Sequence, residues 1–116
     1  MTVRRLKTYA GSQGYVYQYY FVGQRAAGGE VGGTEYIFDV TADRKSTYAV
    51  SILLPRSVVL AWAESHRPLG DSEQYAAVKL RLFRAFDEIE DMQSQGRQLQ
   101  IEASFLEEAL ATLGVE

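Results

Sequence analysis

Tyrosine is the residue type whose number and spacing in this sequence offer the most chemistry. Eight tyrosines occur in 116 residues, and four of them lie between positions 15 and 20. A tyrosine ring can stack on a nucleobase or pack in a protein interface. In a strand, Tyr15, Tyr17 and Tyr19 would share one face, and the basic Arg4 and Arg5 would lie on a neighbouring strand. These five residues are our candidate partner-binding site.

Three interpretations of this aromatic stretch remain open. The rings could form the core beneath helices, they could form a protein interface, or they could stack on single-stranded nucleic acid beside a phosphate track. Both faces of a strand over residues 15–22 are largely apolar, so at least one face is expected to be buried, and the pattern does not say which. The net charge of −3 and the small basic patch argue against nucleic acid.

Two other features suggest catalysis or phosphate binding only weakly. His66 is the only histidine, and a general base needs an orienting partner that the sequence does not place. A surface cation favoured by the helix C-terminal dipole fits His66 better. The glycine-rich segment 28–33 lacks the lysine of a phosphate-binding loop and joins two predicted strands, so it is expected to be a mobile hairpin loop.

The spacing of the acidic residues between positions 87 and 102 raises the possibility of a metal site. Asp91 and Glu102 have the outer spacing of a calcium loop, but Gln93 and Gln95 stand where short carboxylate ligands are needed. The acids at 87, 88, 90 and 91 also oppose the dipole of the helix that they end, and an arginine-bearing partner would account for them. We expect no metal, no cofactor and no catalytic residue, and therefore a protein that is not an enzyme.

Length and composition favour one domain. A chain of 116 residues with 47% apolar content predicts a single globular domain over residues 1–116. The sequence has no cysteine, which excludes disulfides, thiolate metal sites and a cysteine nucleophile. No run approaches the ~18 apolar residues of a membrane span and no apolar segment follows the basic N-terminal residues, so we expect a cytoplasmic protein without a membrane partner.

The order of predicted elements defines an α+β fold. Strands are predicted at 3–9, 15–22, 36–40 and 47–54, forming a four-stranded antiparallel meander. Two to three helices follow and pack on one face: one after Pro55, one from Ser72 to Met92, and one after Ser104. Capping boxes are expected at 71/74 and at 104/107, and a short fifth strand is possible near 98–102.

These expectations combine into a functional hypothesis. Helices on one face of the sheet leave the other face open, which predicts a small interaction domain that binds a protein partner or a second copy, as a homodimer, through a Tyr-rich sheet face. Charge is uneven along the chain: residues 1–70 have a balance of +3 and residues 71–116 of −6. The alternatives are a single-stranded nucleic-acid-binding domain and a small-ligand pocket between sheet and helices around Trp62.

Overall fold

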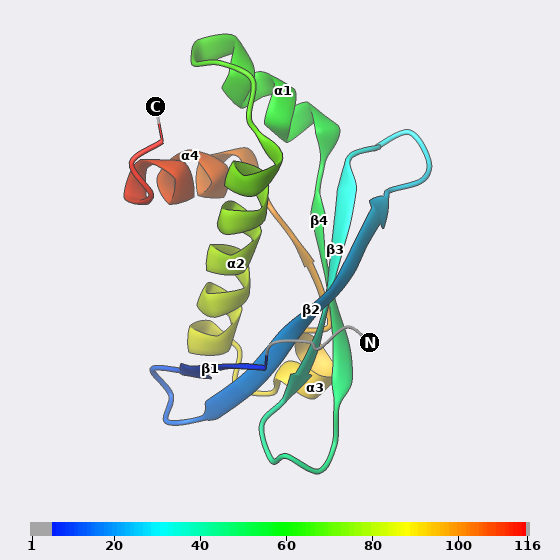
Figure 1. The fold of residues 1–116 in the computed structure, drawn as a ribbon, viewed down its shortest axis with the longest axis vertical. Helices are drawn as coiled ribbons and strands as arrows, with labels where there is room; N and C mark the ends of the chain where they lie inside the picture. The colour runs from blue at the N-terminus through cyan, green and yellow to red at the C-terminus, as the bar shows by residue number, and fades with distance from the viewer. Residues whose placement is uncertain (1–5, 116) are drawn as a thin grey trace.

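The computed structural model describes residues 6–115, which form one five-stranded sheet and four helices (Figure 1). Strands run in the spatial order β1-β2-β3-β4-β5; the first four are antiparallel neighbours, and β5 is parallel to β4. The elements are β1 (Lys7–Ala10), β2 (Val16–Ala26), β3 (Thr34–Thr41), β4 (Tyr48–Leu54), α1 (Arg56–Ser65), α2 (Asp71–Glu88), α3 (Met92–Gln95), β5 (Gln98–Gln100) and α4 (Ala103–Thr112). The predicted α+β class and antiparallel meander are confirmed.

Alternate residues of the central strands point into the core, as the strand period of two requires. The buried set contains three residues of β3, four of β4 and two tyrosines of β2. These residues are Tyr17, Tyr19, Tyr36, Phe38, Val40, Tyr48, Val50, Ile52 and Leu54. The predicted apolar faces of β3 and β4 are therefore the faces that the helices cover.

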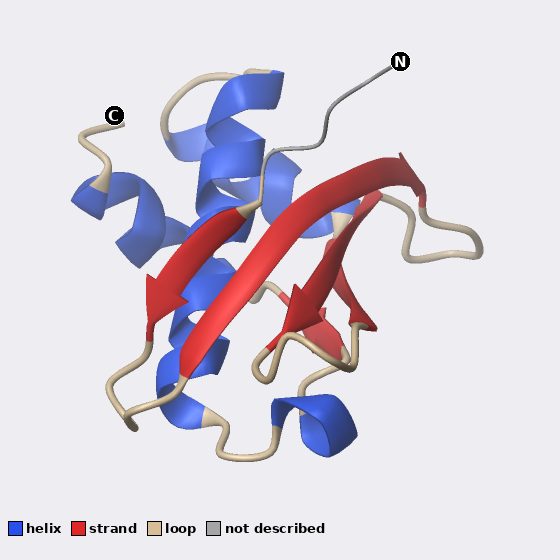
Figure 2. Cartoon of the chain, turned by 60° about the horizontal axis from the view of Figure 1, so that its bottom comes forward, coloured by secondary structure: helices blue, strands red, loops and turns tan. Residues whose placement is uncertain are grey.

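Helices cover only one side of the sheet. In Figure 2, α1, α2 and α4 lie behind the strands and α3 lies at one end of the sheet. Helix α2 buries Val78, Leu82 and Phe86 completely, and burial of each such side chain contributes roughly 1.5–3 kcal/mol. Helix α4 packs against both α1 and α2. No helix within residues 6–115 is long and apolar enough to span a membrane.

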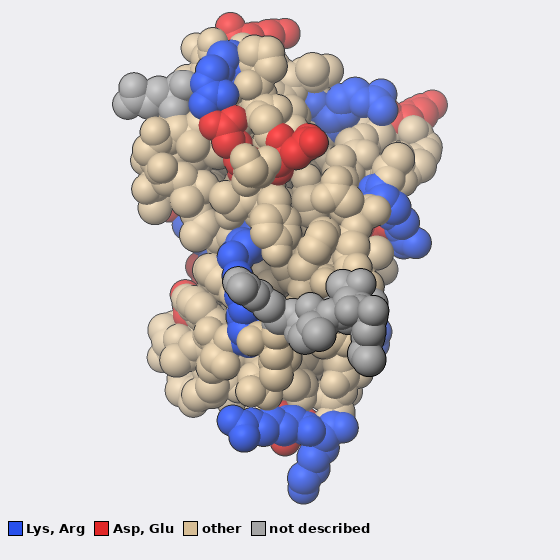
Figure 3. All heavy atoms as spheres, viewed as in Figure 1, with Lys and Arg blue, Asp and Glu red and all other residues tan. Residues whose placement is uncertain are grey.

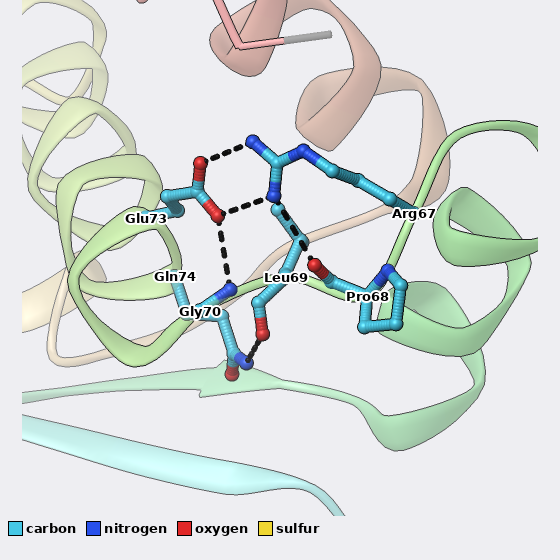
Figure 4. A network of polar contacts seen from close by, with 6 residues as sticks. All are labelled: Arg67, Pro68, Leu69, Gly70, Glu73 and Gln74. Atoms are coloured by element: carbon cyan, nitrogen blue, oxygen red, sulfur yellow. Dashed lines mark hydrogen bonds and ion pairs between the residues drawn. The ribbon is translucent and has the colours of Figure 1, made fainter.

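Helix α2 begins one residue before the predicted position and uses a different cap. The N-cap is Gly70, whose N–H donates to Glu73 Oε1 at 2.9 Å. The guanidinium of Arg67 donates to both oxygens of Glu73, at 3.0 and 2.6 Å (Figure 4). The predicted pair of Asp71 with Gln74 is wrong, because Glu73 is the residue that reaches back to the N-cap.

Helix α2 ends at Glu88, four residues before the predicted end at Met92. Ile89 is already extended, with φ −96° and ψ 113°. The turn between β1 and β2 covers this helix end: Ser12 Oγ donates to the carbonyl of Asp87 at 3.2 Å and Gln13 Nε2 to that of Glu88 at 3.4 Å. These carbonyls are left without helical partners by the helix end, and the turn supplies donors.

The short strand predicted near 98–102 is present as β5, and the sequence pattern does not indicate which strand it pairs with. β5 is parallel to β4 because three helices separate the two strands in sequence, which allows the chain to cross back. Helix α4 has Glu102 at its N-cap without a side-chain capping bond. The predicted capping box of Ser104 with Glu107 is therefore wrong, and Glu107 instead lies 3.6 Å from His66 Nε2.

Candidate functional site

Tyr17 and Tyr19 lie on the face of β2 that α2 covers. They are 2% and 4% exposed. The ring of Tyr17 stacks on Phe86 with centroids 4.2 Å apart, and the ring of Tyr19 meets Phe83 edge-on at 5.7 Å. These two rings therefore do not lie on an open sheet face, since the apolar stripe of α2 packs on this side of the strand, and a part for them in partner binding stays a prediction.

The remaining candidates lie elsewhere. Tyr15 precedes β2, is 44% exposed, and has its ring centroid 6.2 Å from that of Tyr17. Arg4 and Arg5 lie outside the described residues, as do residues 3–5 of the strand predicted at 3–9; the described part of that strand contains β1 (Lys7–Ala10). Of the three described candidates, Tyr15 is exposed while Tyr17 and Tyr19 are buried, and partner binding through Tyr15, Arg4 and Arg5 stays a prediction.

The open face of the sheet is formed by the opposite set of side chains. Pairs that share this face include Gln18 with Thr41, Tyr20 with Asp39 and Ile37 with Ser51. Val16 and Val22 of β2 belong to the same face by alternation up to the register shift between Phe21 and Gly23, and they are 51% and 38% exposed. After this shift Gly23 pairs with Ile37 and Arg25 with Glu35, which brings Arg25 to the open side as well. No helix of the described chain covers this side (Figure 2). We call this set of residues on β2, β3 and β4 the open sheet face.

Charged groups on the open sheet face are matched by neighbours on the same face. Arg25 Nε donates to Glu35 Oε1 at 2.6 Å, and the Ser51 hydroxyl donates to Glu35 Oε2 at 2.7 Å. Hydrogen bonds from Ser51 and Arg25 hold the pKa of Glu35 below its usual value. The Tyr20 hydroxyl donates to Asp39 Oδ2 at 2.6 Å. On this face Arg25 and Glu35 therefore form an ion pair, and the Asp39 carboxylate keeps its charge but has a hydrogen-bond donor.

A shallow hollow of about 370 Å³ lies on this same face. Its lining includes Leu6, Gln18, Tyr20, Thr41 and Thr47. Leu6 is 54% exposed, so an apolar side chain borders the hollow where the chain enters β1. The open sheet face is thus hollowed as well as partly apolar, and a protein interface uses both shape complementarity and apolar contact.

The acidic residues at the end of α2 have partners within the chain. Asp87 accepts the Tyr9 hydroxyl at 2.8 Å and the Ser12 N–H at 2.9 Å. Asp91 caps α3 by accepting the Ser94 N–H at 3.2 Å. These contacts account for Asp87 and Asp91, while Glu90 accepts no hydrogen bond and forms no ion pair among the described residues. Across residues 6–115, no three His, Asp or Glu side chains converge where a metal ion could sit.

His66 is held by its neighbours. Its ring stacks on Trp62 with centroids 4.1 Å apart, and Nδ1 lies 3.0 Å from the Trp62 carbonyl oxygen. Since a carbonyl only accepts, Nδ1 is the donor, and Nε2 faces Glu107. Trp62 itself is 4% exposed and fills the core beneath α1 rather than a ligand pocket. The stacked ring and the Nδ1 hydrogen bond hold His66 in place, which fits a structural role.

The glycine-rich segment joins β2 and β3, as predicted, and its Ala27 N–H donates to Gly33 O at 3.0 Å. Gly33 has φ +102°, and a side chain there would collide with the carbonyl oxygen of Leu54. The glycine is needed for this close approach to the start of α1 rather than for a phosphate.

Comparison of the chain with protein-family models, curated proteins and solved structures finds no match. The class that the fold defines is a two-layer α+β domain with one sheet face that no helix of residues 6–115 covers. Its function is inferred from this chain's own residues.

The structure identifies residues that sequence reasoning did not select. Three of these residues, Val16, Tyr20 and Val22, lie on the open sheet face. Alternation along the predicted strand places them on the opposite side from Tyr15, Tyr17 and Tyr19. Tyr48, a buried residue of β4, also borders a second hollow with Tyr15 and Tyr17. Its partners come from segments distant in sequence, and no local pattern indicates this grouping.

Proposed function

We propose that this protein is a non-catalytic interaction domain that pairs with a second copy of itself through the open sheet face. The observation that supports this most directly is the uncovered face of β2–β4, where Val16 and Val22 are 51% and 38% exposed. Apolar surface that no helix covers is typical of a surface that meets a partner.

The face is a better site for pairing than the sheet edges. One edge is β1, with four residues that include Lys7, and the other is β5, with three. Short, charged edge strands oppose strand-to-strand addition. On the open sheet face Arg25 and Glu35 form an ion pair and the Asp39 carboxylate accepts a hydrogen bond from Tyr20, so two copies can approach without breaking either contact.

A nucleic-acid role has less support. Of the tyrosines between 15 and 20, Tyr20 is the one on the open side of β2, and its hydroxyl is bonded to the Asp39 carboxylate, which repels a phosphate. Among the described residues, both acidic and basic side chains appear on the face seen in Figure 3, and the net charge of the chain is −3. Protein pairing requires no continuous basic track.

Sedimentation of the wild-type protein over a wide concentration range tests the proposal. We expect a concentration-dependent dimer. The double variant Val16→Lys/Val22→Lys places two cations on the open sheet face and should be monomeric, while remaining folded by circular dichroism. The matched control is Leu60→Lys, which replaces a 56% exposed leucine of α1; this variant should dimerise as the wild type does.

A wild-type protein that stays monomeric at high concentration overturns the proposal. So does a dimer that survives the double variant but is lost in Leu60→Lys, since that result moves the interface to the helical layer.

A further inference from the structure

A second hollow, of about 520 Å³, lies at the end of the sheet near α3. It is lined by Tyr15 and Tyr17 at the start of β2, Tyr48 at the start of β4, Asp43 in the β3–β4 turn, and Glu90 and Asp91 between α2 and α3. Three segments far apart in sequence thus place aromatic rings and carboxylates around one space. Its volume lies within the roughly 300–1,000 Å³ of small-ligand pockets.

Two buried tyrosines in this hollow have unused hydroxyls. Tyr17 is 2% and Tyr48 7% exposed, yet neither hydroxyl has a hydrogen-bond partner among the described residues, whereas those of Tyr9 and Tyr20 do. No buried side-chain oxygen in residues 6–115 is sealed off without a partner, so both hydroxyls reach the surface of the hollow. A buried tyrosine usually satisfies its hydroxyl, and these two are available to a bound group.

The charge around the hollow is negative. Asp43, Glu90 and Asp91 line it, and no lysine or arginine does. Asp43 already accepts the Lys45 and Ser46 N–H groups, which lower its pKa, and Asp91 caps α3. Glu90 has no hydrogen bond or ion pair to the described residues. A carboxylate without a partner beside two others favours a cation and excludes an anion.

The tyrosines stay neutral at physiological pH. Burial raises the pKa of Tyr48 to about 12, with further contributions from Tyr17, Asp91 and Asp43, while Arg97 acts in the opposite direction. Burial also raises the pKa of Tyr17, and Tyr15 and Asp91 add to this effect. The rings therefore offer neutral aromatic surface and hydroxyl groups rather than phenolates.

We propose that this hollow binds a guanidinium group. A guanidinium is planar, stacks on aromatic rings, and donates in pairs to carboxylates, so it can use both the tyrosines and the acids. A bare metal ion fits less well, because no three carboxylates converge here within the described chain. The group could belong to a small free molecule or to an arginine side chain of another protein, since the chemistry is the same.

Titrations at low ionic strength, followed by ¹H–¹⁵N NMR and calorimetry, test this site. The probes are butylguanidinium, its neutral isostere butylurea, and a short uncharged peptide with one central arginine. We expect butylguanidinium to bind and butylurea not to bind, with shifts confined to the backbone near Tyr15, Tyr48 and Glu90. A peptide that binds at least about tenfold more tightly than butylguanidinium identifies a protein side chain as the source; equal affinity identifies a small free cation.

Three variants locate the interaction. The double variant Glu90→Gln/Asp91→Asn removes both charges, and the asparagine at position 91 can still cap α3. It should weaken butylguanidinium binding at least about tenfold, because charge-assisted hydrogen bonds are lost. Tyr48→Phe keeps the ring, removes an unused hydroxyl, and should weaken binding several-fold. Glu88→Gln, an acid close in sequence that does not line the hollow, should bind as the wild type does.

Circular dichroism and thermal melting confirm that each variant is folded before its affinity is compared. Equal binding of butylurea, unchanged affinity in Glu90→Gln/Asp91→Asn, shifts centred elsewhere, or no binding of either cationic probe would each overturn the assignment. These outcomes are independent of whether the protein dimerises through its open sheet face.

Discussion

The ring of Tyr17 packs in the core against Phe86, whereas the ring of Tyr15, two residues earlier, is 44% exposed. Truncation should separate these environments. We expect Tyr17→Ala to lower the free energy of unfolding by about 3–5 kcal/mol, the usual cost of removing a buried aromatic ring. Tyr15→Ala should change it by less than about 0.5 kcal/mol. Urea unfolding followed by circular dichroism measures both.

The loss in Tyr17→Ala is a large fraction of the roughly 5–15 kcal/mol that stabilises a typical domain. Equal losses in the two variants would contradict the packing of Tyr17 beneath α2. They would instead place both rings in similar, half-exposed surroundings.

At the level of single residues, alternation along the strand predicted which side chains share a face. Alternation did not predict which face the helices cover, because the two faces are similarly apolar: one presents Tyr17 and Tyr19, and the other presents Val16, Tyr20 and Val22. The choice depends on α2, whose Phe83 and Phe86 meet the tyrosine side. That contact joins residues more than sixty positions apart, and no local pattern indicates it.

At the level of elements, the start of α2 depends on a short polar network (Figure 4). The Glu73 carboxylate accepts hydrogen bonds from two Arg67 nitrogens and from the N–H of Gly70. These bonds lower the pKa of Glu73 from 4.5 to about 2, and the hydrogen bond from Arg67 makes the largest contribution. A carboxylate whose pKa is lower in the folded than in the unfolded chain stabilises the folded state at every pH above the unfolded-state pKa. The contribution is lost as the pH falls from about 4.5 through about 2.

Glu73→Gln should therefore lower the melting temperature at neutral pH, and the difference from wild type should shrink as the pH approaches 2. Thermal melts across this range, followed by circular dichroism, check the trend. Glu64→Gln, at an exposed acid of α1 without an ion pair to the described residues, serves as the control and should show no such convergence. A Glu73→Gln deficit that is the same at every pH would mean that the ion pair does not stabilise α2.

Apolar periodicity predicted the existence of α1, α2 and α4, and their ends were predicted less well. Helix α2 stops at Glu88 because Ser12 and Gln13 supply donors for its last carbonyls and Asp87 accepts the Tyr9 hydroxyl. These donors come from a turn about 75 residues earlier. The acids at the helix end look mismatched with the dipole in sequence, and they are explained once β1 and its turn are in place.

At the level of the whole molecule, the uneven charge of the sequence becomes a difference between two layers. Most of the sheet comes from the first 54 residues, and α2, α3 and α4 come from the half with a charge balance of −6. Pairing through two open sheet faces would direct both helical layers outward, which separates their acidic groups by the thickness of two sheets. Head-to-tail pairing would instead place a sheet against an acidic helical layer.

Salt dependence distinguishes these two arrangements. If the copies meet through open sheet faces, on which Arg25 and Glu35 already pair within one copy, the dimer dissociation constant should change by less than about threefold between about 50 mM and about 500 mM sodium chloride, because few opposite charges meet across such an interface. Head-to-tail pairing of basic and acidic surfaces should weaken steeply over the same range as screening increases. Sedimentation equilibrium at each salt concentration provides the constants, and Leu60→Lys again serves as the folded, dimeric control. A steep loss of dimer with salt would contradict sheet-to-sheet pairing and assign the interface to the charge asymmetry between the layers.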